Sequence, residues 1–261
     1  MALAARRCAR ALIEYDGTAF AGSQRQPQQR TVQGELEEAL NKLTGERITV
    51  RLAGRTDAGV HATGQVIAFC LPNPSRREWP GWAELRRLLN AGLAPDVVVR
   101  SLRAAPAGFD PRRAAVARTY RYRIREGGDR RPTDRHRTLE ISDRLDLAAM
   151  RDAAARMVGK RDFAALGSHP RGRTVRHLMA VSIRQRGTLI EVTVTGNAFL
   201  RRMVRSMVAV LLAAGRGQLA AVDVEQVLDA GQRALRGRAA PACGLTLERI
   251  SFGTTGETNR T

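Results

Sequence analysis

The run of residues 115–126, AVARTYRYRIRE, constrains the fold of this chain most, because its side chains alternate in kind. Aromatic or aliphatic side chains at Tyr120, Tyr122 and Ile124 alternate with cationic ones, which are Arg121, Arg123 and Arg125. Successive side chains of a β-strand point to opposite faces of a sheet, so a period of two predicts a half-buried strand. One face of this strand is expected to be aromatic and the other cationic, which requires a sheet covered on one side.

The remainder of the chain supplies further strands and the helices that cover them. Residues 31–45, TVQGELEEALNKLTG, place apolar side chains at helical spacing, with Thr31 as the expected N-cap and Gly45 as the stop. Further helices are expected at 82–93, 143–159, 198–215 and 220–231, and strands at 9–15, 46–54, 65–71, 96–105 and 244–252, with a hairpin at 174–197. This order predicts the α+β class, with a mixed, mainly antiparallel central sheet and helices on one face.

The stretch 127–137, GGDRRPTDRHR, is polar, charged and rich in turn residues, and is the expected boundary between two halves. The elements after it repeat the order of those before it, so we expect two similar α/β halves. The predicted N-terminal half is 1–126 and the predicted C-terminal half is 127–253. The last residues, 254–261, are expected to form a disordered tail.

Net charge indicates the kind of partner. The chain has 44 Lys and Arg against 25 Asp and Glu, which gives a formal charge of +19 and favours a polyanion such as nucleic acid. Lys42 and Lys160 are the only lysines. Arginine binds phosphate bidentately and stacks on bases, but a GC-rich coding sequence also replaces lysine with arginine, so the excess of arginine alone does not decide the function.

The sequence also limits the compartment. No run of 18 or more apolar residues is present, so no membrane span is expected, and the N-terminus lacks the apolar core of a secretory signal. Cys8, Cys70 and Cys243 are widely spaced in apolar surroundings. We expect free, buried thiols in a reducing compartment and a cytoplasmic protein.

A glycine-rich turn, GRTDAGVHA at 54–62, carries the residues with the clearest chemical potential. Gly54 and Gly59 flank Asp57 and allow sharp turns that bring its carboxylate to a surface. From the residues alone, Asp57 either satisfies its own backbone in this turn or is presented for chemistry. The spacing matches neither a P-loop nor a dinucleotide-binding fingerprint.

Other candidate residues leave two readings open. Tyr120 and Tyr122 are either strand core or a surface on which bases stack. Arg205 lies on an otherwise apolar helix and is either solvated at the edge or buried beside a carboxylate, because an unpaired buried charge costs several kcal/mol. The four histidines lack metal-ligand spacing, and no serine has the surroundings of a hydrolase nucleophile.

These motifs together resemble the tRNA pseudouridine synthase A (TruA) family. GRTDAGVHA is similar to the central motif of that family over nine contiguous residues. The segments EYDGTAFAGSQRQ, TVQGELEEAL, ARTYRYRI, NAFLRRMVRSMV and PACGLTLERISF resemble further family segments in the same order. The resemblance extends from about residue 8 to about residue 253, and it implies the pseudouridine synthase fold.

The resemblance assigns a role to each candidate side chain. Asp57 is expected to be the catalytic carboxylate that attacks the target uridine, either at carbon 6 of the uracil or at the ribose. Tyr120 is expected to stack on the uracil, and Arg205 to pair with Asp57 and keep it ionised and aimed. Arg55 is expected to fill the space that the flipped nucleotide leaves.

The resemblance also implies the substrate and the partners. It implies isomerisation of uridine to pseudouridine in the anticodon arm of tRNA, at positions thirty-eight to forty, by a homodimer without cofactor or metal. A non-catalytic RNA-binding protein and a paralogue with a different RNA target are the alternatives.

Two departures from the family pattern concern RNA docking. Ser23 stands where the family usually has a tryptophan, and Asp110 stands where the family has a histidine, while Phe109 and Arg112 match. We expect the loss of the tryptophan to remove packing surface near the first turn.

Overall fold

The computed structural model describes residues 7–72, 79–167, 172–229 and 239–253. The chain forms two compact units. The first contains Met1–Val116 and Glu248–Thr261, and the second contains Ala117–Leu247. The tail expected to be disordered, 254–261, lies outside the described residues.

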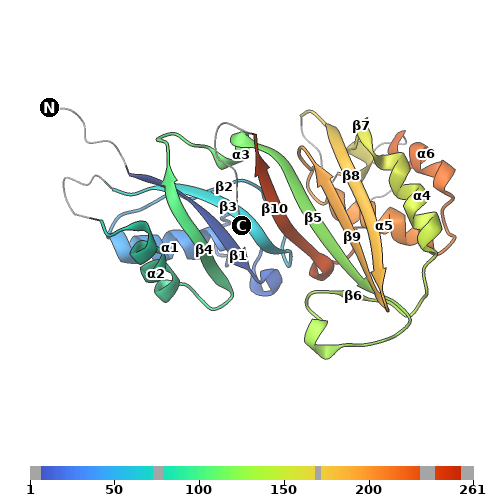
Figure 1. The fold of residues 1–261 in the computed structure, drawn as a ribbon, viewed down its shortest axis with the longest axis horizontal. Helices are drawn as coiled ribbons and strands as arrows, with labels where there is room; N and C mark the ends of the chain where they lie inside the picture. The colour runs from blue at the N-terminus through green and yellow to red at the C-terminus, as the bar shows by residue number, and fades with distance from the viewer. Residues whose placement is uncertain (1–6, 73–78, 168–171, 230–238, 254–261) are drawn as a thin grey trace. The chain divides into compact units, whose positions relative to one another are not determined.

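The first unit is built on strand β1, Cys8–Tyr15, which pairs antiparallel with β3, His61–Cys70, and with β4, Val97–Ala105. The short strand β2, Arg51–Leu52, adds to β3. The order is β4, β1, β3, and then β10, Leu245–Phe252, whose residues from Glu248 belong to this unit (Figure 1). The closing strand of the chain therefore extends a sheet that begins with the first strand.

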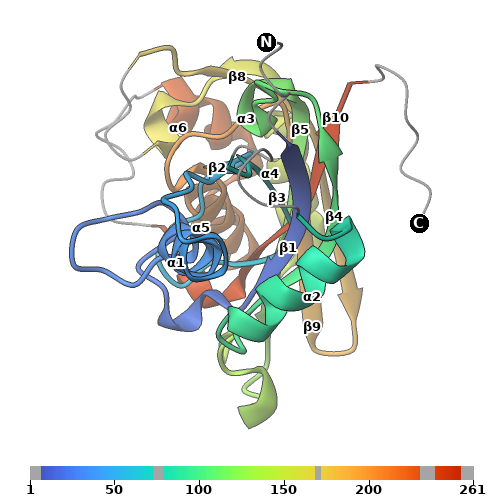
Figure 2. The same cartoon turned by 90° about the vertical axis from the view of Figure 1, so that its left-hand side faces the viewer.

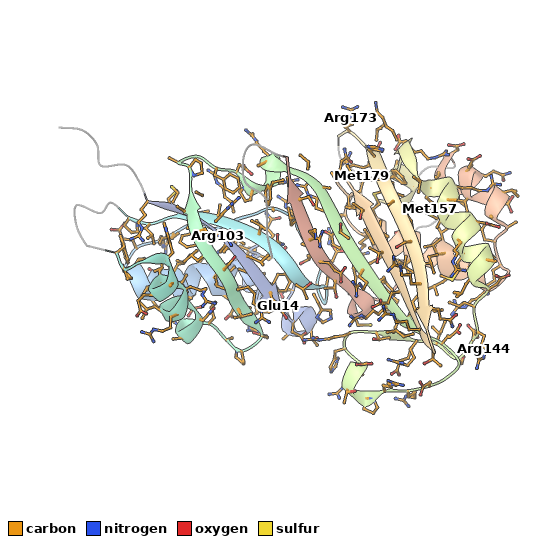
Figure 3. All side chains as sticks on the ribbon, in the orientation of Figure 1. Glu14, Arg103, Arg144, Met157, Arg173 and Met179 are labelled. Atoms are coloured by element: carbon orange, nitrogen blue, oxygen red, sulfur yellow. A yellow bond between two sulfur atoms is a disulfide. The ribbon has the colours of Figure 1, made fainter. Side chains whose placement is uncertain are left out.

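Helices cover one face of this sheet. Helix α2, Trp82–Gly92, packs on β4, and α1, Val32–Thr44, packs beside α2 (Figure 2). As predicted, the hydroxyl of Thr31 accepts a hydrogen bond from Gly34 N, and Gly45 ends the helix with φ 74°. The opposite face carries charged side chains, including the labelled Glu14 and Arg103 (Figure 3). Short helices η1, Gly17–Ala19, and α3, Pro111–Ala114, complete the unit.

The second unit contains an antiparallel sheet in the order β5, β9, β8, β7. Its strands are β5, Ala115–Arg125, β9, Leu189–Gly196, β8, Val175–Arg186, and β7, Gly159–Asp162. The predicted hairpin is β8 and β9, joined at Gly187. One short strand, β6, Leu139–Glu140, pairs parallel with β5, so the pairing is mixed but mainly antiparallel.

The helices of the second unit form its apolar core with the sheet. Helix α4, Leu147–Met157, packs on β8 and on α5, Met203–Gly215, and α6, Val224–Asp229, packs against α4. Short helices lie at Pro132–Asp134, Ala164–Leu166, Ala221–Asp223 and Ala242–Gly244. Burial of aliphatic side chains from α4 and α5 stabilises the unit, because each removes apolar area from water.

The α+β class and the mixed, mainly antiparallel pairing are confirmed. Within the described ranges, none of the helices combines the length and the apolar character needed to cross a bilayer.

The division of the chain differs from the predicted boundary at 126/127. The units divide between Val116 and Ala117, because the residues of β5 from Arg118 onward pair with β9. The closing strand returns to the first unit, where it packs so tightly on β3 that a Cβ at Gly64 would overlap the Glu248 carbonyl oxygen. Both differences come from strand pairing, which a polar linker in the sequence does not reveal.

Some predicted elements differ in extent. Of the strand expected at 46–54, Arg51–Leu52 forms strand β2, and the helix expected from 198 begins at Met203. Arg125 was expected on a cationic strand face but is only 3% exposed, because Asp134 folds back over it and accepts from Nη2 at 2.6 Å.

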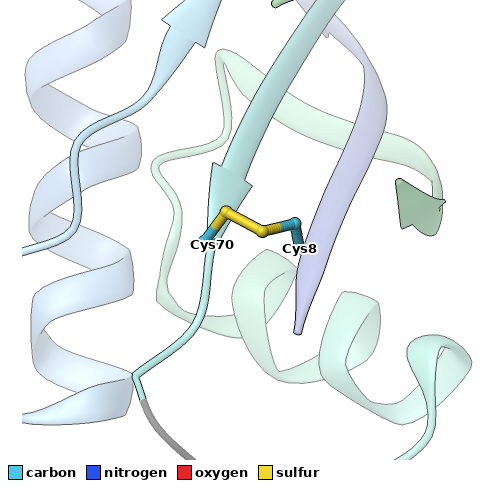
Figure 4. Close-up of a disulfide and its surroundings, with 2 residues drawn as sticks. All are labelled: Cys8 and Cys70. Carbon is cyan, nitrogen blue, oxygen red and sulfur yellow. A yellow bond between two sulfur atoms is a disulfide. The ribbon is translucent and has the colours of Figure 1, made fainter. Parts of the chain in front are cut away.

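The expectation of three free thiols is wrong for two of the cysteines. Cys8 on β1 and Cys70 on β3 form a disulfide (Figure 4). The two residues are directly opposite each other in the antiparallel pair. Register therefore brings together cysteines that are 62 residues apart in the sequence. Cys243 is a free, half-buried thiol.

Candidate functional site

Asp57 lies in the turn between β2 and β3, where its side chain is half-buried. Its carbonyl oxygen accepts a hydrogen bond from Val60 N at 3.2 Å, which closes the turn. Gly59 has φ 77°, a left-handed conformation that favours glycine. The glycine spacing in the sequence therefore corresponds to a real conformational requirement.

Ser23 anchors this turn to the loop after β1. Its Oγ accepts a hydrogen bond from Thr56 N at 2.8 Å, and its own N donates to Thr56 O at 3.1 Å. Ser23 is fully buried, and Tyr15 adds a hydroxyl–hydroxyl hydrogen bond of 2.8 Å to Thr56. The residue immediately before Asp57 is thus held through its backbone and its side chain. At this position, where the family pattern has a tryptophan, the serine of this chain supports the turn directly.

Two glycines of the loop after β1 let it approach the Asp57 turn closely. A Cβ at Gly17 would overlap the Val60 carbonyl oxygen. Gly22 has φ 117°, and its Cβ would lie 3.0 Å from Thr56 O. Larger residues at either position would displace the turn, so these glycines fix where the Asp57 backbone lies.

His61 and Gln65 complete the support from β3. Nδ1 of His61 accepts from Gly17 N at 3.0 Å, and the buried Gln65 amide bridges both backbone groups of Gly54. These bonds give His61 a structural role on the neighbouring loop. Among the described residues, no group of three or more His, Cys, Asp or Glu side chains is placed to hold a metal ion.

Arg55 is exposed at the surface of the same turn. Partial burial and the positive charge of Arg112 lower the pKa of Arg55. Arg112 belongs to helix α3, whose N-cap is Asp110, with Oδ1 accepting from Arg112 N at 2.9 Å and Arg113 N at 3.1 Å. These backbone N–H groups hold the pKa of Asp110 below its usual value. Because the two guanidinium groups repel each other, an anion such as phosphate is favoured between or beside them.

Tyr120 is buried on β5, with 7% of its surface exposed. Its ring packs edge to face against Phe199, with ring centroids 5.3 Å apart and planes at 87°. Gly196 makes this possible, because a Cβ there would lie 2.9 Å from the Phe199 ring. The orientation of the Tyr120 ring therefore depends on a segment that follows β9.

Asn197 fixes that segment in place. Its Oδ1 accepts from His177 N at 2.9 Å, its N donates to His177 O at 3.0 Å, and its O accepts from Arg118 Nη1 at 2.6 Å. Beyond Phe199, Leu200 fills the space beside Gly167. The phenylalanine that meets Tyr120 is thus held between two fixed points.

Arg205 is half-buried on α5 and donates from Nε to Ala240 O at 2.7 Å. The positive charge of Arg205 also acts on Tyr122, whose OH donates to Pro241 O at 2.8 Å. Burial raises the pKa of Tyr122. Tyr120 and Tyr122 share one face of β5, so Arg205 lies on the side of the sheet to which Tyr120 points.

The predicted site residues fall into two sets. Arg55 and Asp57 belong to the first unit, and Tyr120 and Arg205 to the second. Sequence reasoning did not identify Phe199 as a partner of Tyr120 or Ser23 as the anchor of Thr56. No local pattern marks such residues, because both contacts join segments far apart in the chain.

Comparison with known proteins identifies the family. The family model described as tRNA pseudouridine synthase matches residues 11–112 and 153–253. The tRNA pseudouridine synthase A of Geobacter sulfurreducens is 41% identical over 251 residues, covering 94% of this chain and 100% of that protein. The protein of the same name from Thermotoga neapolitana is 39% identical over 246 residues, covering 93% of this chain and 98% of that protein. The chain therefore belongs to the tRNA pseudouridine synthase family, and it is an isomerase that forms pseudouridine in tRNA.

Proposed function

We propose that Asp57 is the nucleophile of this isomerase and that its target uridines lie in the anticodon arm of tRNA, at positions thirty-eight to forty. The carboxylate attacks either carbon 6 of the uracil or the ribose. The bond from N1 to the sugar then breaks, the base turns, carbon 5 bonds to the sugar, and the bond to the Asp57 carboxylate breaks, which regenerates the free carboxylate. Carbon 5 loses a proton and N1 gains one, so every atom is conserved and no cofactor or metal is required.

The construction of the Asp57 turn is the observation that carries this proposal. Hydrogen bonds from Ser23 and Tyr15 hold Thr56, and close-packed glycines fix the backbone on both sides of the carboxylate. A surface carboxylate without a role needs no such support. A nucleophile does, because misplacement by about 1 Å can cost about a hundredfold in rate.

The other candidate side chains serve the same reaction. Tyr120 stacks on the uracil and assists removal of the proton from carbon 5. Arg205 supplies a positive charge that keeps the attacking carboxylate ionised, as nucleophilic catalysis requires. Arg55 enters the space that the extruded nucleotide leaves in the RNA stem.

Binding energy must offset the cost of extruding the target base, which is a few kcal/mol. The formal charge of +19 supports a large electrostatic contribution from phosphate contacts. We further propose that the enzyme works in the cytoplasm as a homodimer in which one tRNA contacts both subunits. Sedimentation of the purified protein with and without tRNA measures the stoichiometry.

The test of the nucleophile is Asp57→Asn, with Asp152→Asn on the exposed side of α4 as the matched control. Asp57→Asn is expected to abolish pseudouridine formation in a tRNA transcript while tRNA affinity stays within about twofold. Asp152→Asn is expected to leave both quantities unchanged. Full activity of Asp57→Asn contradicts the assignment, and loss of binding together with activity favours a role for Asp57 in RNA binding.

The target positions are tested separately with transcripts that carry one uridine at a time in the anticodon arm. Chemical mapping of pseudouridine is expected to detect product at each of the three positions. Product only elsewhere in the tRNA supports the alternative of a paralogue with another target. Ser23 and Asp110, which depart from the family pattern, are the residues that motivate this alternative.

A further inference from the structure

The loop between β5 and α4, residues 127–144, carries five exposed arginines, and Figure 1 shows its course, which includes β6. We call it the arginine loop. Its exposed arginines are Arg130, Arg131, Arg135, Arg137 and Arg144, and its acids are Asp129, Asp134, Glu140 and Asp143. The side chains of Arg130 and Arg131 are 86% and 58% exposed.

The acids of this loop are engaged within the second unit. Asp134 accepts from Arg125 Nη2 at 2.6 Å, and Asp129 lies 3.9 Å from Arg125 Nη1. Asp143 accepts from Arg216 Nε at 2.7 Å. Two of the four carboxylates therefore neutralise a buried guanidinium, and a third pairs with an arginine of another segment. Within the loop, Glu140 lies 3.6 Å from Arg130 Nε and Asp129 lies 3.7 Å from Arg131 Nε. The loop carries five arginines against four acids, and three of these acids also pair with Arg125 or Arg216, so the balance of charge on the loop is positive.

Hydrogen bonds hold the backbone where the arginine loop begins and ends. The N–H groups of Gly127 and Gly128 donate to Asp143 O and Ile141 O, each at 3.1 Å. Glu126, which is 3% exposed, accepts from Leu145 N at 2.9 Å and from Gln185 at 2.8 Å. Arg144, labelled in Figure 3, lies beside Gly127. The arginines thus extend from a fixed framework, which lowers the entropy lost when they bind a ligand.

The chemistry of the loop favours an RNA backbone over a membrane surface. Residues 127–138, GGDRRPTDRHRT, contain no large apolar side chain that would insert into lipid. Arginine presents a planar fork of donors that matches phosphate oxygens. Strand β5 ends at Arg125, five residues beyond Tyr120, which is about 17 Å at roughly 3.4 Å per residue, and the loop begins two residues further along the chain. A phosphate bound here is not that of a nucleotide stacked on Tyr120.

We propose that the arginine loop binds the phosphate backbone of the tRNA substrate at a distance from the target nucleotide, and so contributes to affinity and not to the chemical step. The proposal rests on the proposed function in one respect, which is that Tyr120 marks the position of the target nucleotide. Phosphate contacts fix register without reading sequence. The loop therefore positions the tRNA through the shape of its phosphate backbone and not through its base sequence.

The experiment replaces Arg130, Arg131 and Arg135 together with glutamine. The control replaces three exposed arginines of the first unit, Arg47, Arg86 and Arg87, with glutamine, which removes the same charge. Binding of an unmodified tRNA transcript is measured from 50 to 300 mM salt, together with kcat and KM. Thermal denaturation checks that both variants fold.

The loop variant is expected to lower the slope of log K against log salt by about 2 to 3, since each phosphate contact contributes roughly 0.7 to 0.9. Its KM is expected to rise about tenfold or more, with kcat within about twofold. A variant with lysine at the same three positions is expected to retain most of the slope. The control is expected to change slope and KM much less.

Three results overturn the proposal. An unchanged slope excludes phosphate contacts, and an equal effect of the control assigns the change to net charge. Loss of binding to vesicles of anionic phosphatidylserine without loss of tRNA binding assigns the loop to a membrane. Asp57→Asn separates this proposal from the proposed function, because it tests turnover, whereas the loop variant tests affinity.

Discussion

The ring of Phe199 meets the ring of Tyr120 edge to face, with centroids 5.3 Å apart. The two residues come from different parts of the second unit, the strand β5 and the segment between β9 and α5. Gly196 leaves the space for this contact, and Asn197 fixes the chain beside it. Phe199 is therefore a positioning residue for Tyr120.

Replacing Phe199 with leucine is expected to lower kcat by about two- to tenfold with little change in KM. An edge-to-face aromatic pair contributes roughly 0.5–1.5 kcal/mol beyond the area that it buries, and about 1.4 kcal/mol corresponds to a factor of ten in rate. Steady-state kinetics on a tRNA transcript measure both constants.

Phe199→Tyr retains the ring and is expected to restore most of kcat. The matched control is Phe69→Leu in the buried part of β3, which is expected to lower thermal stability and leave kcat within about twofold. Equal losses of kcat in the two leucine variants indicate a general packing effect and contradict the positioning role.

Ser23→Ala is expected to weaken the Asp57 turn. The substitution removes the acceptor for Thr56 N in a fully buried place, and an unsatisfied buried donor costs about 1–3 kcal/mol. We expect a lower free energy of unfolding by that amount and a fall in kcat, because the backbone beside Asp57 loses its anchor. Urea denaturation and single-turnover kinetics provide the two measurements.

Ser101→Ala, at a half-buried serine of β4 in the same unit, is the control for loss of a hydroxyl. It is expected to change stability by less than about 0.5 kcal/mol. If Ser23→Ala keeps full kcat, the anchor of Thr56 has no part in presenting the carboxylate.

Tyr15 makes the first unit sensitive to alkaline pH. Burial raises the pKa of Tyr15 to about 12, against about 10 in the unfolded chain. The folded state therefore holds this proton more tightly, so the stabilisation is fully present below pH 10 and is lost as the pH rises toward 12. Two pKa units correspond to a loss on the order of 3 kcal/mol.

Absorbance of tyrosinate measures this directly, because the chain contains three tyrosines. Tyr15→Phe is expected to remove one component that titrates near pH 12 and to reduce the loss of stability between pH 10 and 12. Titration of the Tyr15 component near pH 10 contradicts its burial beside Thr56.

The Cys8–Cys70 disulfide is expected to stabilise the first unit. It joins residues 62 apart, and the chain-entropy model gives roughly 4 kcal/mol for a loop of that size. Reduction with dithiothreitol, or the double change to serine, is expected to lower the urea midpoint by a corresponding amount.

Cys243→Ser is the control, since Cys243 is outside the disulfide. Its urea midpoint is expected to respond to dithiothreitol as the wild-type midpoint does. A urea midpoint that does not change after complete reduction of the wild-type protein contradicts a stabilising role for the Cys8–Cys70 bond.

The sequence predicted most elements of both units. Thr31 and Gly45 bound helix α1 as expected, and the alternation around Tyr120 and Tyr122 corresponds to strand β5. These patterns act over a few residues, because a cap bonds within one turn and a strand alternates at each step. The division into units was less predictable, because it depends on where β10 pairs.

The candidate site was predictable as residue types in a motif, but its supporting contacts were not. Asp57 and its flanking glycines are contiguous in the sequence, whereas Ser23 is 33 residues from Thr56. Ser23, which stands where the family has a tryptophan, was expected to reduce packing near the first turn. The structure gives it a hydrogen-bonding role, because its Oγ accepts from Thr56 N at 2.8 Å.

By itself, the sequence determined the strand and helix types, the family and the glycine-rich turn around Asp57, because each depends on neighbouring residues. The tertiary structure alone decided that Cys8 faces Cys70, that Arg125 is buried under Asp134 and that Phe199 meets Tyr120. The physical reason is that sheet register and loop packing join distant segments, and the free energy of those contacts exists only after the chain has folded.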